Sequence, residues 1–371
     1  MVASEYKPQI PLATRTRELL AAGHSCARRG DLRRAVEAYS AAVAEQSNCP
    51  DTHFNLGVVL HQLQDVDGAL QCLMRAWQVD AAFTNAAKGC MSLIASRVRS
   101  GYRWPKPPLQ KLPAQPPSVA VIVCSIDDQK AASTLAMYRR LLEGVPHTID
   151  ILRDALSLAE AYNRGVSATR SDLVILSHDD IDVVADDFAA RLLAHLRTFD
   201  VVGVVGASRA TGPVPVWAGH PWVSGWITHH GSRSPDWTAN TLGWQSVTGG
   251  MQVLDGVLLA ARREVFSAVP FDAQTFDGFH GYDVDWSFRA ASAGWSLAAA
   301  GDLRIVHASG GNYDAVWSKY AARLCEKHRT GAVPAAPSPY FAVNMKSIEE
   351  TSALFDGLMH IASEAASPTP P

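Results

Sequence analysis

The sequence predicts an α/β protein whose main domain has a mostly parallel sheet, preceded by a small domain made only of helices. From Ser118 onward, buried apolar runs alternate with amphipathic stretches, whereas the first hundred residues have helical patterns only. Between them, residues 101–117 hold six prolines, which predicts a stiff extended linker. We therefore expect a helical domain over 14–100, a linker over 101–117, an α/β domain over 118–330, and a C-terminal helix and flexible tail over 331–371.

Composition and charge limit the classes of protein to consider. The chain of 371 residues is 47% hydrophobic and 19% charged, which supplies a core and argues against disorder. A net charge of −3 argues against a nucleic-acid partner, and no apolar run approaches the roughly 20 residues of a membrane span. The start of the chain lacks the apolar segment of a signal peptide, and its six cysteines are scattered without a C-x-x-C pair. We therefore expect a cytoplasmic protein.

An internal repeat runs through the first hundred residues. Five positions pair at one offset of 34 residues: Gly23 with Gly57, Asp31 with Asp65, Ala35 with Ala69, Tyr39 with Leu73, and Ala42 with Ala76. This pattern resembles the tetratricopeptide repeat, and a third helix at about 83–99 would cap the stack. Such repeats form a concave surface, so we expect capture of a peptide or protein partner. The alternative is a scaffold or a dimerisation surface, as in a homodimer, with no ligand.

The α/β domain begins with three strands separated by two helices. The apolar runs predict strands at 119–125, 148–153 and 173–178, with helices at 130–144 and 158–170. Ligands of such sheets bind beyond the carboxyl ends of the strands. The polar residues at these ends are Ser125 and Asp127 after the first strand, Asp154 after the second, and His178, Asp179 and Asp180 after the third.

The acidic end of the third strand predicts a metal site. Carboxylates at the end of a buried strand repel each other and resist desolvation unless a cation lies between them. Oxygen ligands beside a histidine suit Mn²⁺ or Mg²⁺ better than zinc, and such a cation could neutralise a diphosphate. The alternative is a solvated acidic turn, which is common.

Further motifs follow in a fixed order along the chain. They are AYNRG at 161–165, LDG at 254–256, FHGYDVDWSFR at 279–289 and IVHASGG at 305–311. Together with the first strand and the H-D-D stretch, this set resembles a glycosyltransferase of the GT-A fold, in the family-2-like group of inverting, nucleotide-sugar-dependent enzymes. The resemblance covers about 118–330. It implies a Rossmann-like sheet and transfer of a hexosyl group from a nucleotide-diphosphate donor, expected to be a UDP-sugar, to an acceptor hydroxyl.

The resemblance also implies a role for each matching position. Asp180 matches the last acid of the family's D-x-D metal motif, His178 stands where the first acid usually is, and His307 matches a late histidine of the metal and diphosphate site. The positions expected beside the nucleotide are Ser125, Asp127, Asp154, Asn163, Gly165 and Asp179. The positions expected near donor sugar and acceptor are Asp255, Gly256, Trp222 and His280.

Asp283 is the expected catalytic base. It aligns with the Asp of the family's Glu-Asp motif, and Tyr282 takes the place of the Glu. The reaction needs one carboxylate to take the proton of the acceptor hydroxyl while the metal stabilises the leaving diphosphate. The alternative for Asp283 is a helix N-cap, and for Asp255 a turn before Gly256. Asp285 and Arg289 are expected to be structural.

The stretch from 211 to 250 is rich in tryptophan. It holds five of the chain's ten, and it has neither a helical nor a strand period, which predicts a long structured loop. Tryptophan faces such as that of Trp222 can stack on sugar rings. The alternative is a small satellite core, and we expect two or three of the five to serve that purpose.

Two rival functions remain open. A nucleotidyltransferase should carry a glycine-rich, basic loop after the first strand, whereas CSIDDQK is acidic and has no glycine. A non-catalytic interaction protein with a decayed transferase domain is favoured by the departures at His178 and Tyr282. The retained Asp180, Asp283 and His307 weigh against it.

Overall fold

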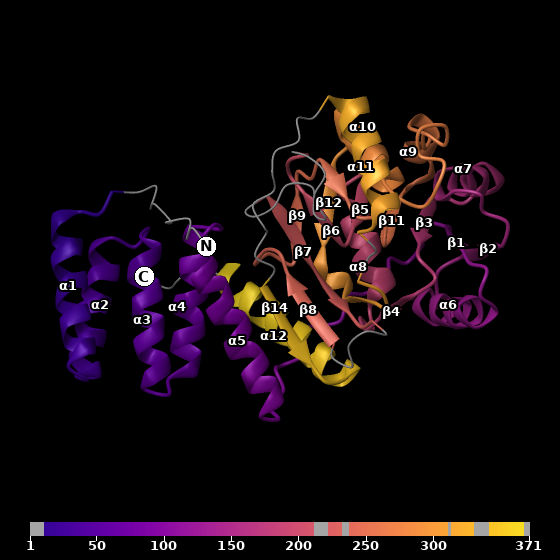
Figure 1. Cartoon of the computed structure of the whole chain (residues 1–371). Helices are drawn as coiled ribbons and strands as arrows, with labels where there is room; N and C mark the ends of the chain where they lie inside the picture. Colours follow the sequence, from indigo (N-terminus) through magenta and orange to yellow (C-terminus); the bar gives the residue numbers. More distant parts are fainter. Residues whose placement is uncertain (1–10, 211–221, 232–236, 311–312, 330–340, 367–371) are drawn as a thin grey trace. The chain divides into compact units, whose positions relative to one another are not determined.

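The structure, a computed structural model, describes residues 11–210, 222–231, 237–310, 313–329 and 341–366 (Figure 1). The chain divides into two compact units, which are described separately. One consists of residues 1–106 together with 356–371, and the other of residues 107–355.

The first unit is built from helical hairpins. Its helices are α1 (Thr14–Arg28), α2 (Leu32–Glu45), α3 (Pro50–Gln62), α4 (Val66–Val79) and α5 (Thr84–Arg99) (Figure 1). The repeat has a steric cause, because a Cβ at Gly23 would lie 2.4 Å from the Tyr39 ring. Asp31 and Asp65 cap α2 and α4 in the same way, each accepting a hydrogen bond from the backbone three residues on. The repeated residues are therefore those at which each hairpin closes and its second helix begins.

The C-terminal helix α12 (Ile348–Ala366) belongs to both units, since their boundary falls within it. In its second half, a Cβ at Gly357 would lie 2.5 Å from Trp104 Nε1 and 2.7 Å from Ile94. The Trp104 ring also lies 5.4 Å from that of His360. Trp104, which falls in the segment expected to be a linker, is therefore a core residue of the first unit.

The second unit is organised around a seven-stranded sheet. In spatial order its strands are β2 (His147–Leu152), β1 (Val119–Cys124), β3 (Leu173–Ser177), β11 (Leu258–Arg262), β5 (Val201–Gly203), β12 (Leu297–Ala300) and β9 (Val247–Gly249). The strands β2, β1 and β3 are parallel, as are β5 and β12, whereas β11 runs antiparallel between β3 and β5. The predicted α/β fold with a mostly parallel sheet is confirmed.

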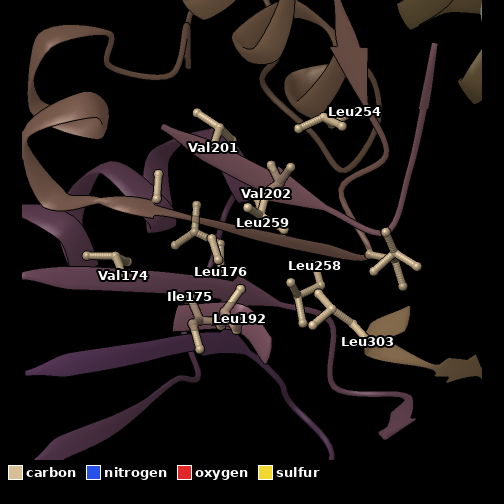
Figure 2. Close-up of a cluster of buried hydrophobic side chains, with 14 of the residues drawn as sticks. Val174, Ile175, Leu176, Leu192, Val201, Val202, Leu254, Leu258, Leu259 and Leu303 are labelled. Carbon is tan, nitrogen blue, oxygen red and sulfur yellow. The ribbon is translucent and has the colours of Figure 1, made fainter. Parts of the chain in front are cut away.

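The core of this unit explains the continuous apolar runs of its strands. Figure 2 shows Val174 and Leu176 of β3 with Leu259 of β11 and Val202 of β5, all without appreciable solvent exposure. A strand that is covered on both faces needs apolar residues at every position. The helices of the unit are α6 (Asp128–Leu141), α7 (Leu158–Ala168), α8 (Phe188–His195), α9 (Arg263–Ala268), α10 (Tyr282–Ser292) and α11 (Ala315–His328), with the short 3₁₀ helix η1 (Gly301–Leu303).

A second sheet completes the unit. Its strands are β10 (Val253–Leu254), β6 (Val205–Ala207), β7 (Val223–His229), β13 (Ile305–His307) and β4 (Ile181–Val183), and β7 also pairs with β8 (Trp237–Thr241), which pairs with β14 (Phe341–Met345). Because β14 pairs with β8, the unit extends beyond residue 330.

The prediction of one long loop between 211 and 250 is wrong, because β7, β8 and β9 lie within it. Most positions of β7 are buried, so its sequence shows no alternation of polar and apolar residues. Trp226 of β7 is completely buried and donates from Nε1 to the carbonyl of Gly243 at 2.8 Å, so it is a core residue as the alternative expected. Trp237 stacks on His230 at 4.2 Å. Trp217 lies outside the described residues.

Candidate active site

The H-D-D stretch and the late histidine meet because their strands pair. Antiparallel pairing of β4 with β13 sets His307 opposite Ile181, and the Ala308 amide donates to the Asp180 carbonyl at 2.8 Å. His307 Nε2 then lies 3.1 Å from Asp180 Oδ1 and 3.4 Å from His178 Nδ1. One ligand atom of each side chain lies within 4.8 Å of the others. His178, Asp180 and His307 are called the triad below.

The protonation states of Asp180 and His178 suit a cation. Burial alone would raise the pKa of Asp180, but the hydrogen bond and charge of His307, with the charges of His178 and Lys130, bring this pKa well below its usual range. Burial, together with the charge of His307, lowers the pKa of His178. A metal requires an ionised carboxylate and a neutral imidazole, which is the state these shifts favour near neutral pH. The triad could therefore hold a divalent metal ion.

The L-D-G motif lies next to the triad because β11 pairs with β3. The His178 amide donates to the carbonyl of Val257 at 3.1 Å, and the Gly256 amide donates to Asp283 Oδ2 at 2.8 Å. A Cβ at Gly256 would lie 2.3 Å from the Tyr282 hydroxyl oxygen and 2.9 Å from the Asp283 Cβ. Only glycine therefore lets this loop approach the start of α10. Asp255 accepts from the Val257 amide at 2.9 Å, as in a turn.

Asp283 lies in the first turn of α10 and does not cap it. The N-cap is Gly281, whose φ of +76° is the left-handed conformation that favours glycine, and no side chain caps the helix. Burial and the negative charge of Asp255 raise the pKa of the Asp283 carboxyl to about 7, although the backbone N–H groups of Val284 and Gly256 oppose this rise. Near neutral pH this carboxyl can accept or release a proton.

Tyr282 connects α10 with the triad. Its side chain is buried, and its hydroxyl oxygen lies 3.2 Å from His178 Nε2 and 3.4 Å from the carbonyl oxygen of Gly256. Burial, with neighbouring Tyr162 and Asp283, raises the pKa of Tyr282 well above its usual value, so the hydroxyl stays protonated. The sequence identified this residue only as a departure from a motif.

The residues after β1 form a second polar group. Ser125 Oγ donates to Asp179 Oδ2 at 2.7 Å, and Lys130 Nζ lies 3.6 Å from Asp179 Oδ1. Asp127 caps α6 by accepting from the amides of Gln129 and Lys130, both at 2.9 Å. Asp179 is thus tied to the end of β1, whereas its neighbour Asp180 belongs to the triad.

Three of the positions expected beside the nucleotide are held by contacts within the fold. Asp154 is exposed and pairs with Arg164 at 2.9 Å. Asn163 exchanges two hydrogen bonds of 2.8 Å with the backbone of Phe271. A Cβ at Gly165 would lie 2.8 Å from a methyl group of Ile122, so this glycine allows α7 to pack on β1. None of these contacts reaches the triad.

The last two positions expected near donor sugar and acceptor, His280 and Trp222, lie in the segments that precede α10 and β7. His280 precedes α10, and its ring lies 6.2 Å from that of Tyr320 on α11. Trp222 precedes β7, and the guanidinium of Arg209 lies 3.7 Å from its ring centroid. Arg209 therefore covers part of the aromatic face that was expected to meet a sugar.

Sequence reasoning missed His229 as a neighbour of the triad. Parallel pairing of β7 with β13 sets His229 beside His307, with ring centroids 5.6 Å apart. Ser309 joins the two, because its carbonyl lies 2.7 Å from His229 Nδ1 and its Oγ lies 3.0 Å from His307 Nε2. Only knowledge of the strand pairing could have identified this residue, since His229 belongs to no motif.

Asp285 is structural, as expected. Its carboxylate is 1% exposed and lies within 2.9 Å of two cationic groups, on Arg289 and Lys327, and of the imidazole of His328. The contacts with Lys327 and His328 join α10 to α11. The two acids of the D-V-D motif, two positions apart, therefore have different surroundings: Asp283 faces Gly256 and Asp285 faces α11.

Comparison with known proteins gives one family and three matches among solved structures. Residues 120–327, more than half of the chain, match the glycosyltransferase-like family. No curated protein matches the chain. Among solved structures, the mannosyltransferase PcManGT of Pyrobaculum calidifontis, in complex with GDP-Man and Mn²⁺, is 15% identical with a TM-score of 0.38, over 80% of this chain and 85% of that one.

Two helical structures match the N-terminal part. The TPR2B domain of yeast Sti1 in its pHsp70 complex is 17% identical, over 24% of this chain and 71% of that one, and MamA RS-1 is 14% identical, over 24% and 51%. Both have a TM-score of 0.23. Among the residues that the structure describes, no helix is long and apolar enough to cross a membrane.

Proposed function

The chain belongs to the glycosyltransferase-like family, and we propose that it transfers a hexosyl group from a nucleotide-diphosphate donor to an acceptor hydroxyl with inversion. One observation carries the proposal. The triad is linked through Tyr282 and Gly256 to a carboxyl whose pKa lies near 7. A group that can hold a cation beside a leaving diphosphate is thus joined to a group that can take a proton.

Asp283 is the proposed general base. With a pKa of about 7, its carboxyl is largely ionised at slightly alkaline pH and still basic enough to accept the proton of a hydroxyl. The acceptor oxygen would lose this proton to Asp283 as it attacks the anomeric carbon, while the bond to the diphosphate breaks. A single displacement of this kind inverts the anomeric centre. Asp255 accepts from the Val257 amide in the turn, and its negative charge helps to keep the Asp283 carboxyl basic.

The triad is the proposed metal site. A divalent cation bound there would neutralise the charge of the leaving diphosphate. Two imidazoles beside one carboxylate suit Mn²⁺ better than Mg²⁺, which prefers oxygen ligands and keeps several waters. We therefore propose Mn²⁺ as the cofactor. Lys130, held 3.6 Å from Asp179, adds a fixed positive charge at the same edge of the sheet.

The nucleotide is proposed to lie beyond the ends of β1 and β2. Ser125, Asp127 and Asp154 lie at these ends, and the general rule for open α/β sheets places ligands there. We propose a UDP-sugar as donor. Asn163 and Gly165 would support this site indirectly, since their contacts fix α7 to Phe271 and to β1.

The tetratricopeptide-like unit is proposed to bind a peptide or protein partner. Docking an acceptor on α1–α5 would raise its effective concentration at Asp283 without changing the chemistry. Val58 of α3 is 38% exposed and gives a place to test this. Val58→Asp should lower transfer to a docked acceptor and leave donor hydrolysis unchanged. Equal change in both activities would favour the alternative of a scaffold or homodimer surface.

A donor screen tests the proposal as a whole. Melting of the chain is measured with UDP-, GDP- and dTDP-sugars, each with Mn²⁺ and with a chelator. A bound donor stabilises the fold by about 2.7 kcal/mol when its concentration is a hundred times its Kd. We expect protection by one donor class, and only with Mn²⁺. Absence of protection by every donor would favour the non-catalytic interaction protein.

A further inference from the structure

The contacts of Tyr282 bear on which nitrogen of His178 carries the proton. The Tyr282 hydroxyl has one hydrogen, and we assign it to the carbonyl oxygen of Gly256 at 3.4 Å, because a carbonyl oxygen can only accept whereas His178 Nε2 can donate or accept. With this assignment, the hydroxyl oxygen acts as acceptor toward His178 Nε2 at 3.2 Å. The proton of the neutral imidazole then lies on Nε2, and Nδ1 presents a lone pair.

The Nδ1 lone pair of His178 lies on the side of the ring that faces Asp180 and His307. Nδ1 of His178 lies 3.4 Å from His307 Nε2 and 3.9 Å from Asp180 Oδ1. Two electron-rich atoms, this nitrogen and the carboxylate oxygen, thus face one another across a distance that a cation would bridge. The opposite tautomer, with the proton on Nδ1, would direct an N–H into the same place and exclude a metal.

We propose that Tyr282 is a positioning residue, whose buried hydroxyl accepts a hydrogen bond from His178 Nε2 and thereby holds Nδ1 toward Asp180 and His307. This inference rests on the proposed metal site. It gives linked roles to the two positions that depart from the motifs. His178 would bind the metal ion, and Tyr282 would orient the His178 ring. Outer partners of metal-bound histidines generally act in this way.

The surroundings of Tyr282 explain how its hydroxyl is held in place. The ring is 3% exposed, and its centroid lies 5.8 Å from that of Tyr162 and 6.0 Å from that of Phe271. Gly256 provides the space for the hydroxyl, because a Cβ there would lie 2.3 Å from the oxygen. The hydroxyl is therefore fixed by packing on the ring and by a hydrogen bond at the oxygen.

The test measures Mn²⁺ binding by calorimetry in the absence of any donor. Tyr282→Phe removes only the hydroxyl, and we expect Mn²⁺ affinity to fall about 10- to 100-fold, the usual effect of losing such a partner. Tyr138→Phe is the matched control, since Tyr138 is equally buried and its hydroxyl makes no hydrogen bond within the described residues. Its Mn²⁺ affinity should equal that of the wild type. Melting of the metal-free proteins checks that each variant folds.

A double-mutant cycle separates positioning from a general structural effect. In a His178→Ala background, Tyr282→Phe should cause no further loss of Mn²⁺ affinity, because the residue that it orients is absent. An equal loss in both backgrounds, or an unchanged affinity in Tyr282→Phe alone, overturns the proposal while the metal site stands.

The tautomer itself is measured by nitrogen NMR of the metal-free chain, with His178→Gln used to assign the signals. We expect the proton of His178 on Nε2 in the wild type and shared between the nitrogens in Tyr282→Phe. A proton on Nδ1 in the wild type overturns the role of Tyr282. Failure of the wild type to bind Mn²⁺ instead overturns the metal site on which that role depends, so the two failures are distinguishable.

Discussion

Replacing Asp283 with asparagine should stabilise the fold at neutral pH and abolish turnover. The folded chain raises the pKa of this carboxyl from its ordinary 3.8 to about 7 through burial and the neighbouring charge of Asp255. The folded state therefore holds the proton more tightly than the unfolded state does. Stability contributed by this group is complete below pH 3.8 and is lost as the pH rises toward 7.

The size of the effect follows from the pKa difference. The pKa rises from 3.8 to about 7, and each pKa unit corresponds to about 1.36 kcal/mol, so the upper bound on the stability effect is about 4 kcal/mol. Asp283 is partly exposed, and an amide oxygen can still accept the hydrogen bond from Gly256, so we expect about 2 kcal/mol. For a unit of this size that corresponds to about 4–8 °C in melting temperature.

The assay compares melting of the two metal-free chains between pH 4 and pH 8. The stabilising difference should be near zero at pH 4, grow with pH, and level off above pH 7. At saturating donor, the variant should lose about 10²- to 10⁴-fold in turnover, the usual contribution of a general base. A difference that does not change with pH would refute the raised pKa, and near-normal turnover would refute the role as base.

Three other substitutions separate function from structure. Asp180→Ala should remove Mn²⁺ binding measured by calorimetry. The metal-free chain should still fold but melt at a lower temperature, because the fold loses the carboxylate that pairs with His307. Retained Mn²⁺ binding would exclude Asp180 from the metal site. Asp285→Ala should destabilise the chain by about 1–3 kcal/mol, because the partly buried Arg289 loses its carboxylate partner whereas Lys327 keeps Asp272; unchanged melting would contradict this. Gly165→Ala should cost about 1–3 kcal/mol through its clash with Ile122 while UDP affinity stays the same; lost affinity with normal melting would indicate direct nucleotide contact instead.

The parts predicted from the sequence are those in which local pattern and structure coincide. The 34-residue offset predicted the helical hairpins because a single contact, Gly23 against Tyr39, recurs as Gly57 against Leu73. The apolar runs predicted β1, β2 and β3 because those strands are parallel neighbours in a sheet with helices packed against it. The polar residues after β3 predicted the position of His178 and Asp180, two of the three residues of the triad.

Long-range pairing accounts for what the sequence did not predict. His229 reaches His307 only because β7 runs parallel to β13, and no motif records that pairing. The strand β7 was expected to be loop because most of its positions are buried, which removes the alternating pattern. In the sequence, Tyr282 was only a departure from the Glu-Asp motif. In the structure, its hydroxyl oxygen lies 3.2 Å from His178 Nε2.

The most direct test of the account is Mn²⁺-dependent release of nucleotide diphosphate, compared between the wild type and Asp283→Asn at saturating donor. The account predicts release by the wild type only when Mn²⁺ is present, and binding without release by the variant, because the triad would hold the cation and Asp283 would take the proton. Release by the wild type that continues in the presence of a chelator would contradict the role of the triad. Equal release by both proteins would contradict the role of Asp283.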